Sequence, residues 1–166
     1  MAGKNSKKSK KRLSWDNYFL KVADTISKRA TCDRGQSGCV IAQDNQILVA
    51  GYVGSPPGFP HCDDTGHLLK KIKHNDGSMT EHCVRTIHAE QNAICQAARR
   101  GIAIKGATLY TRMTPCRVCA MLIISCGITR VVCERKYHAG EESEEMFKIA
   151  KIPIEYKYDE VQEYKD

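Results

Sequence analysis

The sequence predicts an α/β domain in which helices pack on both faces of a mixed β-sheet. Its 166 residues are enough for one compact domain with a substantial core. A helical pattern opens the chain, two β-rich segments follow it, and strands then alternate with helices toward the C-terminus. This order is typical of a sheet covered on both faces, and no internal repeat or linker divides the chain.

The first three predicted elements lie between Ser14 and residue 52. Ser14 is a favourable N-cap, and apolar residues recur at helical spacing from there to about Arg29. Residues 38–42 and 46–52 are apolar and β-rich, and the short polar turn between them predicts a hairpin. Residues 53–83 are rich in proline, glycine and charge, so we expect a long loop, and loops of this length are usually functional.

The second half of the chain predicts regular strand–helix alternation. A helix is expected to begin at His88, because the following residues are good helix formers, and to stop at Gly101. The remaining predicted elements are a strand at 107–113, a helix that follows Pro115, a strand at 128–134, a helix at 141–150 and a short strand at 153–157.

The most informative pattern is His-x-Glu at residues 88–90, followed after twenty-four residues by Pro-Cys-x-x-Cys at residues 115–119. Zinc prefers imidazole and thiolate ligands in a tetrahedral shell, and catalytic sites leave one corner open for water. We therefore predict His88, Cys116 and Cys119 as the three protein ligands of a catalytic zinc. Both cysteines lie near a predicted helix N-terminus, which favours their thiolate forms.

Glu90 lies two residues from the predicted ligand His88 and is not needed as a ligand. We predict that it is the catalytic acid and base of a hydrolytic deamination, which moves protons between water, a ring nitrogen and the departing amine. The alternatives are a structural zinc site and a redox Cys-x-x-Cys pair. A structural zinc site would need a fourth protein ligand. A redox pair would have no need of the upstream histidine or glutamate, so the full pattern favours catalysis.

The formal net charge of +7 is concentrated at the N-terminus. Six of the positive charges lie in the first twelve residues, which contain no acid, so the rest of the chain is nearly neutral. Residues 1–13 are therefore predicted to be a disordered basic tail. The tail could contact nucleic acid or another acidic surface, although we favour a solvated extension, and the neutral body gives no case for a polynucleotide groove.

No apolar stretch is long enough to span a membrane, and the N-terminus lacks the apolar core of a signal peptide. We therefore expect a cytoplasmic protein with no membrane partner. In that reducing setting, the nine cysteines are expected to be metal ligands or small buried residues rather than disulfides.

From about Ser14 to Tyr156 the chain resembles the deoxycytidylate (dCMP) deaminases of the zinc-dependent cytidine deaminase superfamily, whose signature includes the zinc motif. Further segments carry the resemblance, namely Ala-Thr-Cys-Asp-Arg at 30–34, Gly-Cys-Val-Ile at 38–41, Gly-Tyr-Val-Gly-Ser-Pro at 51–56, Gly-Phe-Pro-His-Cys-Asp at 58–63 and the run at 83–94. Together these segments are more specific than the zinc motif alone.

The resemblance implies a three-layer α/β/α fold of the cytidine deaminase type, with a central five-stranded mixed sheet, formed by residues 14–166. It implies zinc-dependent deamination of dCMP to dUMP and ammonia, which would supply dUMP for thymidylate synthesis. It also implies a homo-oligomer, with a hexamer favoured, that dCTP with Mg²⁺ activates and dTTP inhibits.

The resemblance also suggests binding residues. Tyr137, by its position, and Arg34 and Ser55 are predicted to contact the substrate, with Tyr137 and Arg34 at the phosphate. Tyr137 could instead only cap the sheet, and Arg34 could be an ordinary surface charge. The predicted effector-binding residues are Gly51, Tyr52 and Gly54.

Some relatives bind a structural metal near the long loop, which suggests a second zinc here. The candidate ligands are Cys32, Cys62, His67 and Cys83, with His61 and His82 nearby in the sequence. The alternative is buried free cysteines and exposed histidines. The family commonly has asparagine where this chain has Val53, whose side chain cannot hydrogen-bond, so the usual effector response is in question.

Three other functions compete with dCMP deamination. A bifunctional enzyme would also deaminate dCTP. A deaminase of tRNA or single-stranded DNA would need a basic or aromatic path for flanking nucleotides, but the body is nearly neutral and the single tryptophan, Trp15, adjoins the tail. A non-catalytic zinc module that binds a partner or DNA through the tail would have no use for Glu90.

Overall fold

Five strands form the central sheet of the computed structural model, which describes residues 12–73, 77 and 79–162. Nearly all of the predicted basic tail, residues 1–11, lies outside the described residues. The strand order is β2-β1-β5-β6-β7, with β1 antiparallel to both neighbours and β5, β6 and β7 parallel. The strands are β1 (Gly38–Gln43), β2 (Gln46–Tyr52), β5 (Thr108–Met113), β6 (Arg130–Tyr137) and β7 (Ile154–Tyr156), and the short β8 (Val161–Gln162) pairs with the end of β6.

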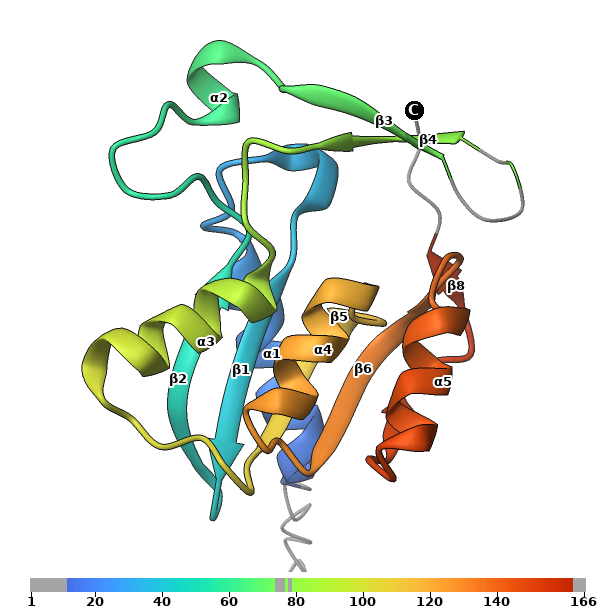
Figure 1. The fold of residues 1–166 in the computed structure, drawn as a ribbon. Helices are drawn as coiled ribbons and strands as arrows, with labels where there is room; N and C mark the ends of the chain where they lie inside the picture. Colours follow the sequence, from blue (N-terminus) through green and yellow to red (C-terminus); the bar gives the residue numbers. More distant parts are fainter. Residues whose placement is uncertain (1–11, 74–76, 78, 163–166) are drawn as a thin grey trace, which may run out of the picture.

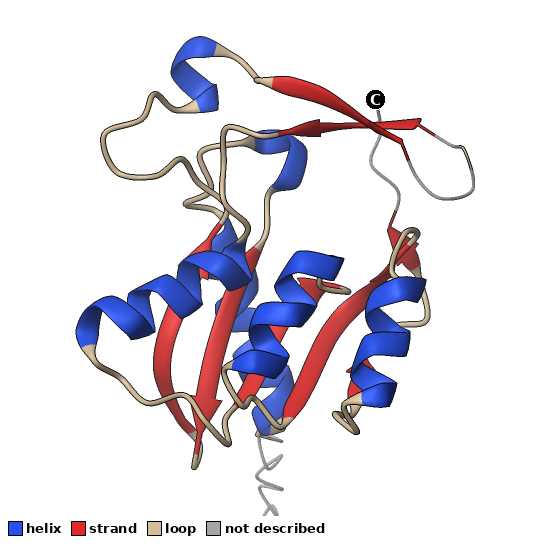
Figure 2. Ribbon diagram, in the orientation of Figure 1, coloured by secondary structure: helices blue, strands red, loops and turns tan. Residues whose placement is uncertain are grey.

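Helices cover both faces of this sheet, as predicted (Figure 1). One face is covered by α1 (Trp15–Ser27), and the other by α3 (Ala89–Arg100), α4 (Arg117–Ser125) and α5 (Glu141–Ile149) (Figure 2). A cluster of buried apolar side chains fills the space on each side of the sheet. The predicted three-layer α/β/α class and five-stranded mixed sheet are therefore confirmed. Among the described residues, no helix is both long and apolar enough to cross a membrane.

The predicted hairpin joins β1 to β2 through Asp44 and Asn45, which both adopt the positive φ angles that such a tight turn requires. Gly51 of β2 lies directly under α3, where a Cβ atom would collide with the backbone of Ala89 and Ala93. The missing side chain lets α3 approach the sheet closely, and this contact fixes the position of the helix that carries Glu90.

The segment predicted as one long loop contains regular structure, so that prediction was wrong in part. It holds a short helix α2 (Cys62–Thr65) and an antiparallel pair of strands, β3 (Leu69–Lys73) and β4 (Met79–Cys83). Outside this segment, a 3-10 turn lies at Asp33–Gly35, before β1. We call β3 and β4 the arm, which projects beyond the end of the central sheet in Figure 1. The residues of β3 are all exposed, so no alternation of buried and polar positions marks it in the sequence.

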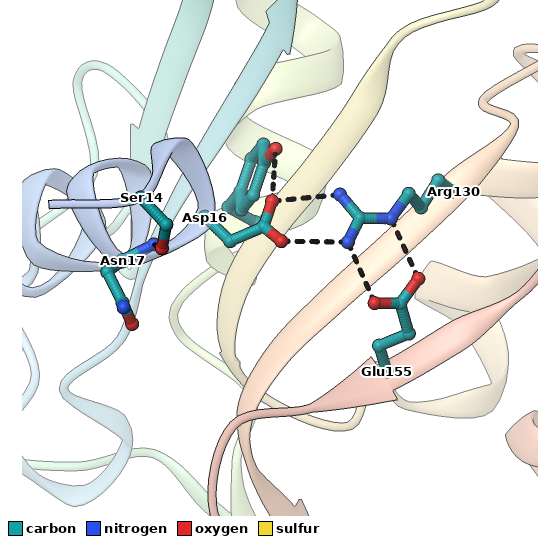
Figure 3. A network of polar contacts seen from close by, with 6 residues as sticks. Ser14, Asp16, Asn17, Arg130 and Glu155 are labelled. Carbon is teal, nitrogen blue, oxygen red and sulfur yellow. Dashed lines mark hydrogen bonds and ion pairs between the residues drawn. The ribbon is translucent and has the colours of Figure 1, made fainter.

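A polar network attaches α1 to the sheet (Figure 3). Ser14 caps the helix by accepting a hydrogen bond from the backbone of Asn17 at 3.3 Å. Arg130 of β6 donates to both oxygens of Asp16, at 2.8 and 2.9 Å, and to both oxygens of Glu155, at 2.8 Å each. These hydrogen bonds from Arg130 lower the pKa of each carboxyl group below its ordinary value.

We expect Arg130→Gln to lower the melting temperature by about 2–4 °C at pH 7, because two carboxylates lose a shared bidentate partner. A carboxyl group with a lowered folded pKa stabilises the fold above its unfolded pKa of about 4 and loses that contribution as the pH falls. The difference between the two proteins should therefore shrink as the pH falls from about 5 to 3. Thermal unfolding of both proteins across this pH range measures the difference. The control is Lys28→Gln, which removes an exposed ion pair with Asp24. A pH-independent difference would contradict the assignment.

Candidate active site and metal centre

The N-termini of α3 and α4 meet at three of the predicted metal ligands. His88 is the N-cap of α3, and Cys116 is the N-cap of α4, which begins one residue after it. His88 Nδ1 lies 3.4 Å from the sulfur of Cys116 and 3.4 Å from that of Cys119. The structure thus brings these three side chains together from segments far apart in the sequence.

The geometry of this triad fits a zinc ion. The ligand atoms of a tetrahedral zinc shell lie about 3.5 Å apart, and all three atoms here lie within 4.8 Å of one another. One nitrogen and two sulfurs are donors that zinc prefers, and three protein ligands leave a corner for water or substrate. The side-chain oxygen of Gln91 accepts a hydrogen bond from the backbone of His88 at 2.9 Å, which helps to fix the start of α3.

The protein alone already favours one thiolate in the triad. A hydrogen bond from Cys119, together with the neighbouring His88, lowers the pKa of Cys116 to about 4. The same contact with Cys116, followed by burial, raises the pKa of Cys119, and the hydrogen bond with Cys116 raises the pKa of His88. A low thiol pKa beside a histidine is typical of metal-binding and reactive cysteines.

Glu90 occupies the first turn of α3, close to the triad. Its side chain is only 6% exposed, and its Oε2 atom lies 3.6 Å from the sulfur of Cys119. Its Oε1 atom accepts a hydrogen bond from the hydroxyl of Thr111 in β5, at 2.7 Å. Sequence reasoning placed Glu90 beside the metal ligands but did not identify Thr111, because only the pairing of β5 with β1 brings Thr111 within reach of Glu90.

Thr114, in the loop before Cys116, connects that loop to the adjacent C-terminal ends of β6 and β7. Its hydroxyl accepts a hydrogen bond from the backbone of Tyr137 at 3.0 Å and lies 3.2 Å from the hydroxyl of Tyr156. Tyr156 in turn donates to Glu144 of α5 at 2.6 Å. Burial, followed by the charge of Cys116, raises the pKa of Tyr137, and the backbone of this predicted substrate residue bonds to Thr114, two residues before Cys116.

A pocket of about 430 Å³ lies between α3 and β2. Tyr52, Gly54 and Ser55 line it, which unites two predicted effector residues with a predicted substrate residue. The hydroxyl of Ser55 is buried and has no hydrogen-bond partner among the described residues. From α3 the pocket receives Asn92, Gln96 and Arg100.

Two residues of the predicted effector loop lie outside the lining of this pocket, as far as the described residues show. Gly51 packs under α3 instead. The side chain of Val53 is 6% exposed and belongs to the core, while its backbone bonds to Ser37 at 3.1 Å and to Thr31 at 3.0 Å. The valine that departs from the family pattern is therefore a packing residue in this fold.

Two arginines lie near the base of the arm, Arg34 in the segment before β1 and Arg85 in the segment before α3. Arg34 donates from its guanidinium to the backbone oxygen of Glu81 in the arm, at 3.2 Å. Arg85, which sequence reasoning missed, lies three residues before His88, and its Nε atom is buried without a hydrogen-bond partner in the described part of the chain. Its place in the run at 83–94, between two candidate metal ligands, was the signal that could have identified it.

A second cluster lies at the base of the arm. Its members are the four residues predicted as ligands of a second zinc, Cys32, Cys62, His67 and Cys83, whose ligand atoms all lie within 4.8 Å of one another. The nitrogen Nδ1 of His67 is 3.6 Å from the sulfur of Cys32, and its Nε2 atom is 3.1 Å from a carboxylate oxygen of Asp33. A carboxylate on the far nitrogen is the usual way to orient a metal-binding histidine.

The donor set of this second cluster also fits zinc. Three sulfurs and one nitrogen fill a tetrahedral shell completely, which is the pattern of a structural site. Burial raises the pKa of Cys83, but backbone hydrogen bonds, first from Arg85, outweigh it and lower that pKa to about 7. Burial, followed by the hydrogen bond with Cys83, raises the pKa of Cys62 to about 12.

Comparison with known proteins agrees with this geometry. Residues 13–135 match the family described as "Cytidine and deoxycytidylate deaminase zinc-binding region". ComE operon protein 2 of Bacillus subtilis is 35% identical over 144 residues, which are 87% of this chain and 71% of that protein. Deoxycytidylate deaminase of Saccharomyces cerevisiae is also 35% identical over 144 residues, but these cover 86% of this chain and only 45% of the yeast enzyme.

The same fold occurs in the dCMP deaminase of cyanophage S-TIM5, whose structure was solved in complex with dCMP and dUMP. The two structures superpose with a TM-score of 0.69 at 24% sequence identity, over 88% of this chain and 98% of the phage protein. This likeness concerns the fold.

Proposed function

This chain belongs to the family of zinc-binding cytidine and deoxycytidylate deaminases, and on that basis we propose that it converts dCMP and water to dUMP and ammonia. The main support for this proposal is that His88, Cys116 and Cys119 converge, with Glu90 beside them. The names of the yeast and phage relatives support dCMP as the substrate. We further propose that the dUMP serves thymidylate synthesis and that the protein works in a reducing cytosol, where its cysteines are metal ligands or thiols rather than disulfides.

In this proposal, His88, Cys116 and Cys119 would hold the catalytic zinc, which supplies the activation of water for hydrolysis. Glu90 takes a proton as water adds to C4 of the cytosine ring, and delivers that proton to N3. The same carboxylate then takes the proton of the new C4 hydroxyl and gives it to the amino group. The C–N bond breaks, ammonia leaves and the C4 carbonyl forms.

Ammonia release from the purified full chain tests this function. The assay offers dCMP, CMP, deoxycytidine, dCTP and an RNA oligonucleotide, each with and without dCTP or dTTP as effector. We expect turnover of dCMP, and turnover of dCTP as well would indicate the bifunctional alternative. If only the RNA reacts, the substrate is a polynucleotide and the proposal is wrong.

For the phosphate of dCMP we propose Arg85 as a partner, together with Tyr137 and Arg34 as the sequence suggested. A guanidinium donor that is buried without a partner is costly, and a phosphate oxygen would satisfy it. Three residues of extended chain span at most about 10 Å, so Arg85 lies close to His88. Arg34 already donates to the backbone of the arm, through an exposed hydrogen bond.

We expect Arg85→Gln to lower kcat/KM for dCMP by about ten- to a hundred-fold, because one charge-assisted contact with the phosphate is lost. Deoxycytidine, which has no phosphate, should be turned over at the wild-type rate. Steady-state kinetics with both substrates measure this, with Arg34→Gln as the comparison, for which we expect a smaller effect. An equal loss with both substrates would assign Arg85 to the structure of the site rather than to the phosphate.

We propose the pocket between α3 and β2 as the binding site of dCTP with Mg²⁺ as activator and dTTP as inhibitor. Its volume of about 430 Å³ suits a nucleotide, and Arg100 and Gln96 offer hydrogen-bond donors to it. Val53 is buried in the core, so we propose that its replacement of asparagine affects this response little. The effector arms of the ammonia assay test the response.

We also propose that the chain forms a homo-oligomer, with a hexamer favoured. The outer face of α4 presents Val118, Met121 and Leu122, which are 52%, 45% and 37% exposed. An apolar stripe of this kind on a helix favours contact with another protein surface. Most soluble oligomers are homo-oligomers, so we propose a second copy of this chain as the partner. The mass of the particle in solution by light scattering tests the oligomer.

The second cluster is proposed to hold a structural zinc. Its ligands come from the segment before β1, from α2 and the turn after it, and from the arm, so a metal there would attach the arm to the body of the domain. A site closed by four protein ligands has no corner for substrate, so its role is to order this region.

A further inference from the structure

Three neighbouring strands place a row of small side chains under Glu90. Thr111 of β5 pairs with Cys39 of β1 on one side and with Cys133 of β6 on the other. Paired residues of neighbouring strands project from the same face of a sheet, so the three side chains lie side by side. All three are fully buried.

Within this row, Thr111 is the strong hydrogen-bond donor. Its hydroxyl lies 2.7 Å from Oε1 of Glu90, whereas a thiol is a weak donor. Burial, followed by the charge of Glu90, raises the pKa of both Cys39 and Cys133, so these neighbours are neutral thiols. A carboxylate that is only 6% exposed needs such a partner, since burial without a hydrogen bond is costly.

The two oxygens of Glu90 therefore have different surroundings. Oε1 is held by the sheet through Thr111, and Oε2 lies on the side of Cys119, toward the metal triad. Threonine in a strand has a stiff χ1 angle, so its hydroxyl is fixed by the backbone of β5. The arrangement leaves one oxygen anchored and the other directed at the place where protons must move.

We infer that Thr111 is a positioning residue, which orients the carboxylate of Glu90 so that Oε2 exchanges protons with the substrate. The inference rests on the proposed function, since Glu90 must be the proton carrier. A misplacement of about 1 Å in such a group can cost about a hundred-fold in rate. Thr111 lies under Glu90 and does not need to touch the substrate, so its effect should fall on kcat rather than on KM.

The test compares two replacements at one position in the zinc-loaded full chain. Thr111→Val keeps the branched shape and removes the hydroxyl, whereas Thr111→Ser keeps the hydroxyl. We expect Thr111→Val to lower kcat for dCMP by about ten- to a hundred-fold with KM within about two-fold, and Thr111→Ser to restore most of the rate. Zinc content should stay close to wild type in both variants. Thr108→Val, in the same strand but away from Glu90, is the control.

Full kcat in Thr111→Val, or an equal loss in Thr111→Val and Thr111→Ser, would overturn the inference. A wild-type protein that releases no ammonia from dCMP would overturn the proposed function instead. In that case crystal structures of the zinc-loaded variants still test whether Thr111 orients Glu90. We expect Glu90 to leave its orientation in Thr111→Val and to keep it in Thr111→Ser, and an unchanged Glu90 in Thr111→Val would refute the positioning role.

Discussion

Glu90→Gln should lower the turnover of dCMP by about 10³- to 10⁴-fold while the fold and the zinc content stay those of the wild type. Glutamine has nearly the same shape and can still accept the hydrogen bond from Thr111, but it cannot carry a proton. Because one carboxylate serves both proton transfers in the proposed reaction, the variant should lose both contributions. Ammonia release under saturating dCMP, with zinc measured by mass spectrometry on the same sample, gives the result.

The control for this variant is Glu145→Gln, which removes an exposed carboxylate from α5 and should leave the rate unchanged. Full activity of Glu90→Gln would show that the assigned acid and base is wrong. Loss of zinc together with activity would instead make Glu90 a part of the metal site. The two measurements on one sample therefore separate chemistry from metal binding.

The second large effect is expected from removing one ligand at each metal cluster. Cys119→Ser should lose the catalytic zinc and all turnover, because a serine hydroxyl is a poor zinc ligand at neutral pH. Cys83→Ser should lose the other zinc and destabilise the region around the arm by several kcal/mol, since binding of a structural metal is coupled to folding (about 10–16 kcal/mol in zinc-finger peptides). Native mass spectrometry counts the metal, and hydrogen exchange follows the arm.

These two variants act as controls for each other, and Cys95→Ser, an exposed cysteine outside both clusters, is the neutral comparison. Each ligand variant should keep the zinc of the cluster that was not altered. Full metal occupancy in Cys119→Ser would refute the catalytic site. A wild-type protein that holds zinc only at the triad would refute the structural site and leave the catalytic proposal intact.

The local spacing of residues predicted most of the helices and strands. The cap at Ser14, the start of α3 at His88 and its end at Gly101 all appear where the sequence placed them, since these signals act within one helical turn. The arm was missed because β3 (Leu-Lys-Lys-Ile-Lys) is exposed throughout and β4 is short and mostly polar, so neither carries an apolar alternation. These two strands are recognised only by their pairing with each other, and neither shows a strand pattern in the sequence.

The sequence by itself determined the chemical groups of the site, because His88, Glu90, Cys116 and Cys119 are set by spacing within two short segments. It also suggested four ligands for a second metal. Only the tertiary structure decided which distant groups meet those residues. Thr111 reaches Glu90 through the register of β5 with its neighbours, and Val53 is buried by the packing of the core. Such contacts depend on how whole elements pair and pack, and that arrangement is not a property of any local stretch of chain.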